Sequence, residues 1–189
     1  MEYKWIIREK ADPKAVESLG KEINLNQTLA NMLVNRGVDT FQKAKDFFRP
    51  DPDKLHDPYL MKDMDKAVER LALAIHKEEK ILVYGDYDVD GTTSVAMFYG
   101  FLKQFYSHVS FYIPDRYKEG YGISEKGVRF AAENNFSLVV SLDCGIKAIE
   151  KVALAKELGV DFIICDHHTP GDIFPPAVAI LDPMRSDLE

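Results

Sequence analysis

Residues 81–93 read ILVYGDYDVDGTT, an apolar run that leads directly into glycine and three alternating aspartates. A short apolar run that ends in turn residues is typical of a buried strand. Similar runs follow along the chain, so the sequence predicts strands at residues 81–84, 109–113, 138–142, 160–164 and 177–181. Between them, residues 93–105, 124–134 and 146–158 carry apolar side chains at helical spacing. Strands that alternate with helices predict an α/β fold, in which helices flank a parallel five-stranded sheet.

A small helical region precedes this α/β pattern. Asn26 and Thr40 are residue types that cap helix N-termini, and each stands ahead of apolar residues at helical spacing. A third helix is expected to carry its apolar residues on one face, namely Met64, Ala67, Val68, Leu71 and Ile75. We therefore expect a helical N-terminal region over residues 1–78 and an α/β domain over residues 79–187. The final Leu188-Glu189 resembles an expression-tag junction, so we expect a truncated chain with a tag remnant at residues 188–189.

The composition is that of an ordinary globular protein, with 46% hydrophobic and 29% charged residues. No stretch approaches the ~20 apolar residues that a membrane span needs, and the opening residues are too polar for a signal peptide. Two cysteines, Cys144 and Cys165, do not indicate a disulfide framework, so we expect a cytoplasmic protein without a membrane partner. The net charge of −7 argues against a broad grip on duplex DNA, but carboxylates that hold cations can still act on phosphodiesters.

Polar residues follow each of the first four predicted strands. Right-handed crossovers bring the carboxyl ends of parallel strands to one edge of the sheet, where ligands bind in open α/β folds. The polar clusters occupy residues 85–93, 114–122, 143–145 and 166–168. Because all of them are expected at the same edge, the sequence predicts a functional site there.

The aspartates of the first cluster have the character of metal ligands. Asp86, Asp88 and Asp90 alternate, so an extended chain would place their carboxylates on one side. Carboxylates that close together disfavour joint ionisation, and a bound cation removes this penalty. Carboxylates combined with an imidazole suit Mn²⁺ or Mg²⁺. With Asp143 and His167 added, the set can hold two ions, which can activate a water for in-line displacement at phosphorus.

Other interpretations of these residues remain open at this point. The aspartate run can be a solvated turn, and the histidine pair can be a polar turn before Pro170-Gly171. An EF-hand loop is excluded because its twelfth position, counted from Asp86, is Met97 and not glutamate. A phosphatase of the haloacid-dehalogenase type would make Asp88 a covalent nucleophile, but it does not account for Asp-His-His at residues 166–168.

The remaining polar residues can serve a phosphate ligand. Asp166 can orient a neighbouring imidazole, and His168 can contact a phosphate or donate a proton. The guanidinium of Arg116 matches two phosphate oxygens, while Gly120 and Gly122 would let the backbone approach a ligand closely. The alternative for the Arg116 segment is an ordinary exposed loop.

Taken together, these motifs resemble those of the DHH phosphoesterases. Residues 83–93 are similar to the first motif of that superfamily, and residues 141–145 to the third. Residues 113–122 resemble the second motif in its RecJ form, and the Glu-Gly-Tyr-Gly portion at residues 119–122 distinguishes that branch. Asp-His-His at residues 166–168 is the motif that names the superfamily.

The resemblance implies a role for each motif residue. The expected metal ligands are Asp88, Asp90, Asp143 and His167, with Asp86 and Asp166 as further ligands or supports. Arg116 and His168 would contact the scissile phosphate, with Asp166 and His168 as the catalytic pair. The expected substrate-binding residues are Arg116, Gly120, Gly122 and Thr92. The implied activity is 5′→3′ hydrolysis of single-stranded DNA with Mn²⁺ or Mg²⁺, in DNA repair and recombination. Single-strand-binding protein and a helicase would be the implied partners.

Two functional alternatives are kept beside the exonuclease. One is a related phosphodiesterase that acts on short oligonucleotides or cyclic dinucleotides, and the other is a non-catalytic nucleic-acid-binding module. Enzymes of the RecJ type also carry a further metal-binding aspartate, a second catalytic lobe and an OB-type domain that this sequence does not contain. We therefore expect this chain by itself to fold, but to bind metal weakly and to cleave poorly.

Overall fold

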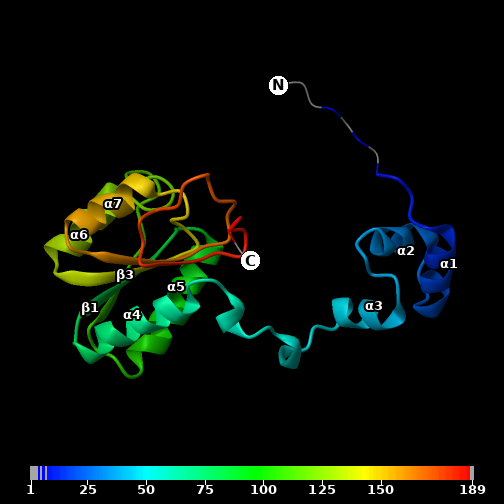
Figure 1. Ribbon diagram of the computed structural model, residues 1–189, viewed down its shortest axis with the longest axis horizontal. Helices are drawn as coiled ribbons and strands as arrows, with labels where there is room; N and C mark the ends of the chain where they lie inside the picture. Colours follow the sequence, from blue (N-terminus) through cyan, green and yellow to red (C-terminus); the bar gives the residue numbers. More distant parts are fainter. Residues whose placement is uncertain (1–3, 5, 7, 188–189) are drawn as a thin grey trace. The chain divides into compact units, whose positions relative to one another are not determined.

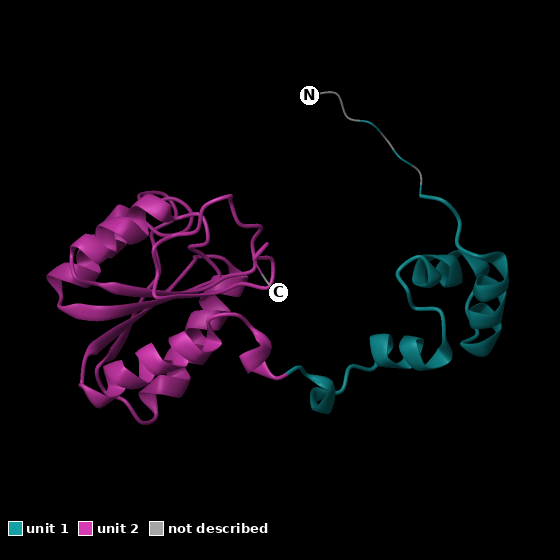
Figure 2. Ribbon diagram, viewed as in Figure 1, with its two compact units in different colours: residues 1–56 teal, residues 57–189 magenta. Residues whose placement is uncertain are grey.

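The structure is a computed structural model that describes residues 4, 6 and 8–187. The expected tag remnant at residues 188–189 lies outside these described residues. The chain divides into two compact units, residues 1–56 and residues 57–189 (Figure 2). Within the described ranges, no helix combines the length and the apolar character that crossing a membrane requires.

The first unit is helical. It contains α1 (Pro13–Glu22), α2 (Gln27–Val34), α3 (Phe41–Phe48) and the short 3-10 helix η1 (Pro52–Lys54). The predicted caps are confirmed, because Asn26 accepts a hydrogen bond from the Leu29 N–H and Thr40 from the Lys43 N–H. A small core holds these helices together, formed by Leu19, Leu33, Val38 and Ala44.

The second unit contains the predicted sheet. Its helices are η2 (Pro58–Leu60), α4 (Met64–His76), α5 (Val89–Lys103), α6 (Glu125–Glu133) and α7 (Ile149–Glu157). Its strands are β1 (Lys80–Gly85), β2 (Val109–Tyr112), β3 (Phe136–Leu142), β4 (Asp161–Cys165) and β5 (Ala179–Leu181). All strand pairs are parallel, in the order β2-β1-β3-β4-β5. The predicted α/β fold with a parallel five-stranded sheet is therefore confirmed.

Helices cover both faces of this sheet. In Figure 1, α4 and α5 lie on one face, while α6 and α7 lie on the other. Strands β1 and β3 are consequently buried on both sides, which explains why they read as nearly continuous apolar runs. The order also creates a switch point between β1 and β3, where the chain leaves the two strands toward opposite edges of the sheet. Ligands bind at such points in open α/β sheets.

Helix α4 belongs with the sheet and not with the first unit. The sequence placed a boundary at residue 78, whereas the structure divides the chain between residues 56 and 57. The reason is packing, because Ala67 and Ala74 of α4 share a core with strand residues. Arg70 adds polar links, since it donates hydrogen bonds to Asp161 over 2.6 Å and to Glu79 over 2.7 Å.

Helix α5 begins earlier than the sequence predicted. It starts at Val89 instead of residue 93, and the Asp88 carboxylate caps it by accepting a hydrogen bond from the Gly91 N–H over 3.0 Å. The expectation that Asp86, Asp88 and Asp90 lie along one extended segment is therefore wrong. Asp86 follows the strand, Asp88 is the cap, and Asp90 stands in the first helical turn. An aspartate at the N-cap stabilises a helix by ~1 kcal/mol, which favours this early start.

Candidate active site

The residues singled out by the sequence meet at the carboxyl edge of the sheet. Asp86 follows β1, Asp143 follows β3, and Asp166, His167 and His168 follow β4. A cavity of about 650 Å³ opens at this edge, and its lining includes Asp90, Asp143, Asp166 and His167. The predicted convergence of polar clusters is thus a feature of the fold.

Asp143 lies at the centre of the site in an unusual backbone conformation. Its φ is 61°, in the left-handed region that costs most non-glycine residues ~1–2 kcal/mol. Its N–H donates to the carbonyl of Cys165 over 2.8 Å, so the hydrogen bonding of the sheet edge holds the strained residue in place. One carboxylate oxygen, Oδ1, faces His167 Nε2 at 3.0 Å. The other, Oδ2, is buried and has no hydrogen-bond partner among the described residues.

Burial and a neighbouring carboxylate raise the pKa of Asp143. Burial is the larger cause, and the adjacent Asp88 carboxylate adds to it, while the contact with His167 opposes the rise. The structure therefore brings the carboxylates of Asp88 and Asp143 together, although they lie on different segments of the chain. Two close carboxylates without a counter-charge favour the binding of a cation.

Asp86 is fully buried and presents a second unsatisfied oxygen. Its Oδ1 accepts hydrogen bonds from the Tyr87 N–H over 2.8 Å and from the Gly122 N–H over 3.5 Å. Its Oδ2 has no partner within the part of the chain that the structure describes. A buried carboxylate oxygen without a donor is costly, and a cation would remove that cost.

The donor set fits a hard divalent cation. Ligand atoms of Asp143, His167 and His168 lie within 4.8 Å of one another, and the carboxylates of Asp86 and Asp88 lie beside the same edge. Oxygen ligands with an imidazole suit Mn²⁺ or Mg²⁺, and a thiolate is not needed. Burial raises the pKa of the Cys165 thiol to about 12 and that of the Cys144 thiol well above its ordinary value, so both thiols are protonated at neutral pH.

Two glycines bring the start of α5 against the end of β1. A Cβ atom at Gly91 would lie 2.5 Å from the Asp86 carbonyl oxygen and 2.6 Å from the Asp86 nitrogen. A Cβ atom at Gly85 would lie 2.9 Å from the Gly91 carbonyl oxygen. Only glycine permits this approach. It places Asp88 and Asp90 beside the sheet edge. Thr92, expected in substrate binding, donates its hydroxyl to the Asp88 carbonyl over 2.6 Å.

Asp166 organises the Asp-His-His segment with both of its oxygens. Its Oδ2 accepts from the Ile146 N–H over 3.0 Å. Its Oδ1 accepts from the His167 and His168 N–H groups over 2.7 Å and 3.2 Å, and from the His168 ring nitrogen Nδ1 over 2.7 Å. Because a carboxylate can only accept, His168 carries a proton on Nδ1, and Nε2 of the neutral ring faces the Tyr121 hydroxyl at 3.1 Å.

The hydrogen bond to Asp166 raises the pKa of His168, and burial opposes this rise. A raised histidine pKa stabilises the fold below the pKa of the unfolded chain, and this contribution is lost as the pH rises through the folded value. We expect Asp166→Asn to lower the pKa of His168 toward its ordinary value, because the charged acceptor is removed. Titration of the His168 ring protons by NMR in the metal-free protein measures this change. Tyr121→Phe is the control, since it removes only the Nε2 contact, and an unchanged His168 pKa in Asp166→Asn would contradict the assignment.

The segment that follows β2 carries the positively charged Arg116, which is connected to the site by a series of contacting rings. The Arg116 guanidinium lies over the Tyr87 ring at 5.2 Å. The Tyr87 and Tyr121 rings form a T-shaped pair with centroids 6.2 Å apart, and the Tyr121 and His168 rings form another at 6.1 Å. The sequence motif contains Tyr121 but does not indicate its contacts. The structure makes it the contact between the Arg116 segment and the histidine pair.

Gly120 and Gly122 serve the backbone conformation of this segment. Their φ angles are +83° and +75°, which are rare for other residues. A Cβ atom at either position would meet no other atom of the described chain within 4 Å. Open space therefore remains beside both glycines for a ligand, while the turn itself already requires them.

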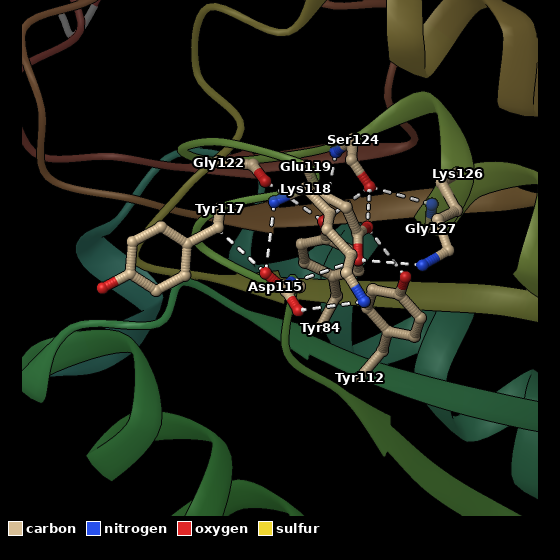
Figure 3. A network of polar contacts seen from close by, with 10 residues as sticks. All are labelled: Tyr84, Tyr112, Asp115, Tyr117, Lys118, Glu119, Gly122, Ser124, Lys126 and Gly127. Atoms are coloured by element: carbon tan, nitrogen blue, oxygen red, sulfur yellow. Dashed lines mark hydrogen bonds and ion pairs between the residues drawn. The ribbon is translucent and has the colours of Figure 1, made fainter.

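Sequence reasoning missed a buried polar network beneath the same segment. Figure 3 shows Glu119 receiving hydrogen bonds from Tyr112 and Ser124, and Tyr84 bonded to Ser124. A tyrosine hydroxyl buried at the end of a central strand must find a partner, so Tyr84 was the signal that could have revealed this network.

The chain matches the family model described as DHH family, N-terminal domain, over residues 80–189. It is 42% identical to the single-stranded-DNA-specific exonuclease RecJ of Bacillus subtilis (strain 168), over 96% of this chain and 23% of that protein. It is 38% identical to the protein of the same name from Escherichia coli (strain K12), over 66% of this chain and 22% of that protein. The chain thus spans about a quarter of the length of these relatives.

Solved structures agree with this placement. The crystal structure of RecJ in complex with Mn²⁺ from Thermus thermophilus matches with a TM-score of 0.68 and 26% identity, over 96% of this chain and 25% of that one. A crystal structure of exonuclease RecJ bound to manganese matches with a TM-score of 0.64 and 33% identity, over 71% of this chain and 35% of that one. The resemblance drawn from the motifs is confirmed, and the chain belongs to the DHH family.

Proposed function

We propose that this protein is a divalent-metal-dependent nuclease that hydrolyses single-stranded DNA from the 5′ end. One observation carries the proposal: buried carboxylate oxygens of Asp86 and Asp143 lack partners in the described chain, at the edge where His167 and His168 arrive. Membership of the DHH family and the similarity to exonucleases named as specific for single-stranded DNA support the substrate. Structures of similar proteins with manganese support the metal.

In this proposal the carboxylates and one imidazole hold the metal. The ligands would be Asp86, Asp88, Asp90, Asp143 and His167, which together offer enough donors for two ions. Bound divalent cations supply stabilisation of the negative charge that develops on the phosphate and lower the pKa of an attacking water. Such a cation would balance the negative charge of Asp143 and Asp88 and remove the repulsion that, after burial, raises the pKa of Asp143.

The remaining residues act on the phosphodiester. Arg116 supplies a guanidinium for two phosphate oxygens, and its stacking on Tyr87 holds it in place. His168 presents Nε2 for a proton or a phosphate contact, and Asp166 orients the ring through Nδ1. Gly120 and Gly122 shape the turn that faces the substrate, while Thr92 fixes the first turn of α5 beneath the ligands.

The proposal extends to the cellular process and the partners of the nuclease. Exonucleases specific for single strands act where duplex DNA has been opened, so we place the protein in DNA repair and recombination in the cytoplasm. A helicase would produce its substrate, and a single-strand-binding protein would compete for or present it. The similarity to the RecJ relatives supports these assignments.

The direct test uses the full-length gene product with DNA labelled at either the 5′ or the 3′ end. We expect mononucleotides to be released from the 5′ end of single strands in Mn²⁺, and no release in EDTA. Duplex DNA of the same sequence is the substrate control. Cleavage that is confined to di- and trinucleotides would assign the protein to oligonucleotide hydrolysis. Binding of DNA without any cleavage in Mn²⁺ or Mg²⁺ would reject an enzyme and favour a binding module.

A further inference from the structure

Glu119 is a buried carboxylate whose two oxygens are both saturated by hydrogen bonds. Its side chain is 4% exposed. Oε2 accepts from the Tyr112 hydroxyl over 2.8 Å and from the Ser124 hydroxyl over 2.7 Å. Oε1 accepts from the Asp115 N–H over 3.1 Å and from Lys126 Nζ over 3.4 Å. A buried charge with this many donors is a stable, directional anchor.

These donors come from both ends of the substrate-facing segment. Tyr112 ends β2 and Asp115 begins the segment, whereas Ser124 caps α6. Glu119 therefore closes residues 115–124 into a loop at its base (Figure 3). Ser124 accepts from the Gly127 N–H over 2.9 Å while it donates to Glu119, so the start of α6 is part of the same anchor.

The anchor extends to the strand that leads into the candidate metal ligands. The Tyr84 hydroxyl donates to the Gly122 carbonyl over 3.1 Å and accepts from the Ser124 N–H over 3.1 Å. The Tyr84 and Tyr112 rings stack with their centroids 5.3 Å apart. The loop is thus fixed to β1 and β2 through hydroxyl groups.

The exposed side of this loop carries the groups that face the phosphate in the proposed function. Arg116 lies over Tyr87, and the Tyr121 hydroxyl lies 3.1 Å from His168 Nε2. Neither group contacts Glu119 directly in the hydrogen bonds of the described residues. The hydrogen bonds of Glu119 therefore hold the loop and do not contact the phosphate-facing groups.

We propose that Glu119 is a positioning residue, which holds the loop of residues 115–124 so that Arg116 and Tyr121 face the phosphodiester. This inference rests on the proposed function. It distinguishes two anchors in one site. The metal ligands are held mainly by the sheet edge and α5, with one long contact from the loop, the Gly122 N–H to Asp86 over 3.5 Å, while the phosphate-facing groups are held by Glu119. Burial raises the pKa of Glu119, but hydrogen bonds from Ser124 and the Asp115 N–H outweigh it and lower the pKa to about 2, so the anchor is ionised at neutral pH.

The test is Glu119→Gln in the full-length gene product, with kinetics on single-stranded DNA and Mn²⁺ affinity measured by electron paramagnetic resonance. Glutamine keeps the shape but replaces an acceptor by a donor, so the Asp115 N–H or a hydroxyl loses its partner. We expect kcat/KM to fall about 10- to 100-fold, as for a displacement of about 1 Å of a catalytic group. Mn²⁺ affinity should stay within about twofold of the wild-type value. General unfolding would instead lower both kcat/KM and Mn²⁺ affinity.

A double-mutant cycle with Arg116→Ala identifies the route of the effect. If Glu119 acts through the loop, Glu119→Gln should add less than about threefold to the loss in Arg116→Ala, because coupled residues are not additive. Arg129→Met is the matched control on the same helix, because Arg129 is 51% exposed and pairs with Glu125 outside the Glu119 network, so its loss should leave kinetics unchanged.

Three results would overturn the inference. The first is unchanged kinetics in Glu119→Gln, and the second is a loss of Mn²⁺ affinity parallel to the loss of kcat/KM. The third is a double variant whose loss of kcat/KM equals the product of the losses in the two single variants. Absence of cleavage by the wild-type protein would remove the proposed function and this inference with it. Wild-type cleavage together with an unaffected Glu119→Gln protein would reject the inference alone.

Discussion

Replacement of Asp143 by asparagine is expected to lower the rate of DNA cleavage by about a thousand-fold without loss of the fold. Stabilisation by a catalytic metal amounts to several kcal/mol, and each 1.36 kcal/mol corresponds to about tenfold in rate. Asp143 combines an unpartnered buried oxygen, a contact with His167 and the neighbouring Asp88 carboxylate. Loss of its charge should therefore weaken metal binding as well as cleavage. Titration with Mn²⁺ and single-turnover kinetics on the same protein measure both effects.

Asparagine is the informative substitution because of the backbone at this position. Asparagine tolerates a positive φ, whereas alanine at a φ of 61° adds a conformational cost of ~1–2 kcal/mol. The raised pKa of Asp143 means that its ionised form destabilises the metal-free fold at neutral pH, so Asp143→Asn should melt at the wild-type temperature or above it. Asp143→Ala should melt lower. Cleavage by Asp143→Asn at a rate near that of the wild type would refute the assigned role.

Replacement of Gly91 by alanine is expected to destabilise the second unit by about 3 kcal/mol and to lower Tm by roughly 10 °C. The added Cβ would lie 2.5–2.6 Å from backbone atoms of Asp86, and a backbone cannot move aside as the end of a flexible side chain can. To relieve this clash, the start of α5 must move away from β1, and this movement displaces Asp88 and Asp90. Mn²⁺ affinity should fall together with Tm. Thermal unfolding followed by circular dichroism, with and without Mn²⁺, measures the change.

Gly100→Ala is the matched control in the same helix. A Cβ atom at Gly100 would meet no atom of the described chain within 4 Å. Alanine is a better helix former than glycine by up to ~1 kcal/mol, so the Gly100→Ala variant should be at least as stable as the wild type. If both alanine variants behaved alike, the close approach of α5 to β1 would not be what positions Asp88.

The sheet and its functional edge could be predicted because their signals are local. The apolar runs near Tyr84 and Leu142 end in glycine or aspartate, and parallel topology then decides where those ends meet. The start of α5 could not be predicted in the same way, because an aspartate such as Asp88, two residues ahead of Asp90-Gly91, is equally typical of a loop and of a helix cap. The structure resolves this by the hydrogen bond from the Gly91 N–H to Asp88.

The supporting contacts of the site could not be predicted because they join distant elements. Glu119 receives donors from β2 and from the start of α6, which no spacing within a single motif reveals. The role of Asp166 was ambiguous for a related reason. A sequence shows that a carboxylate is present, but not that the Ile146 N–H and the His168 ring already occupy its oxygens.

If the site binds metal as proposed, its origin in loops after β1, β3 and β4 would link folding to the supply of divalent ions. In the unfolded chain, Asp86, Asp143 and His167 are far apart, so a cation that needs all of them binds only the folded state. Its binding free energy then adds to the stability of the sheet, by ~2.7 kcal/mol when the free ion is at one hundred times its dissociation constant. Under the proposed function, scarcity of metal would lower the population of folded molecules as well as their turnover, because the same cation would serve the reaction and link residues that follow three strands.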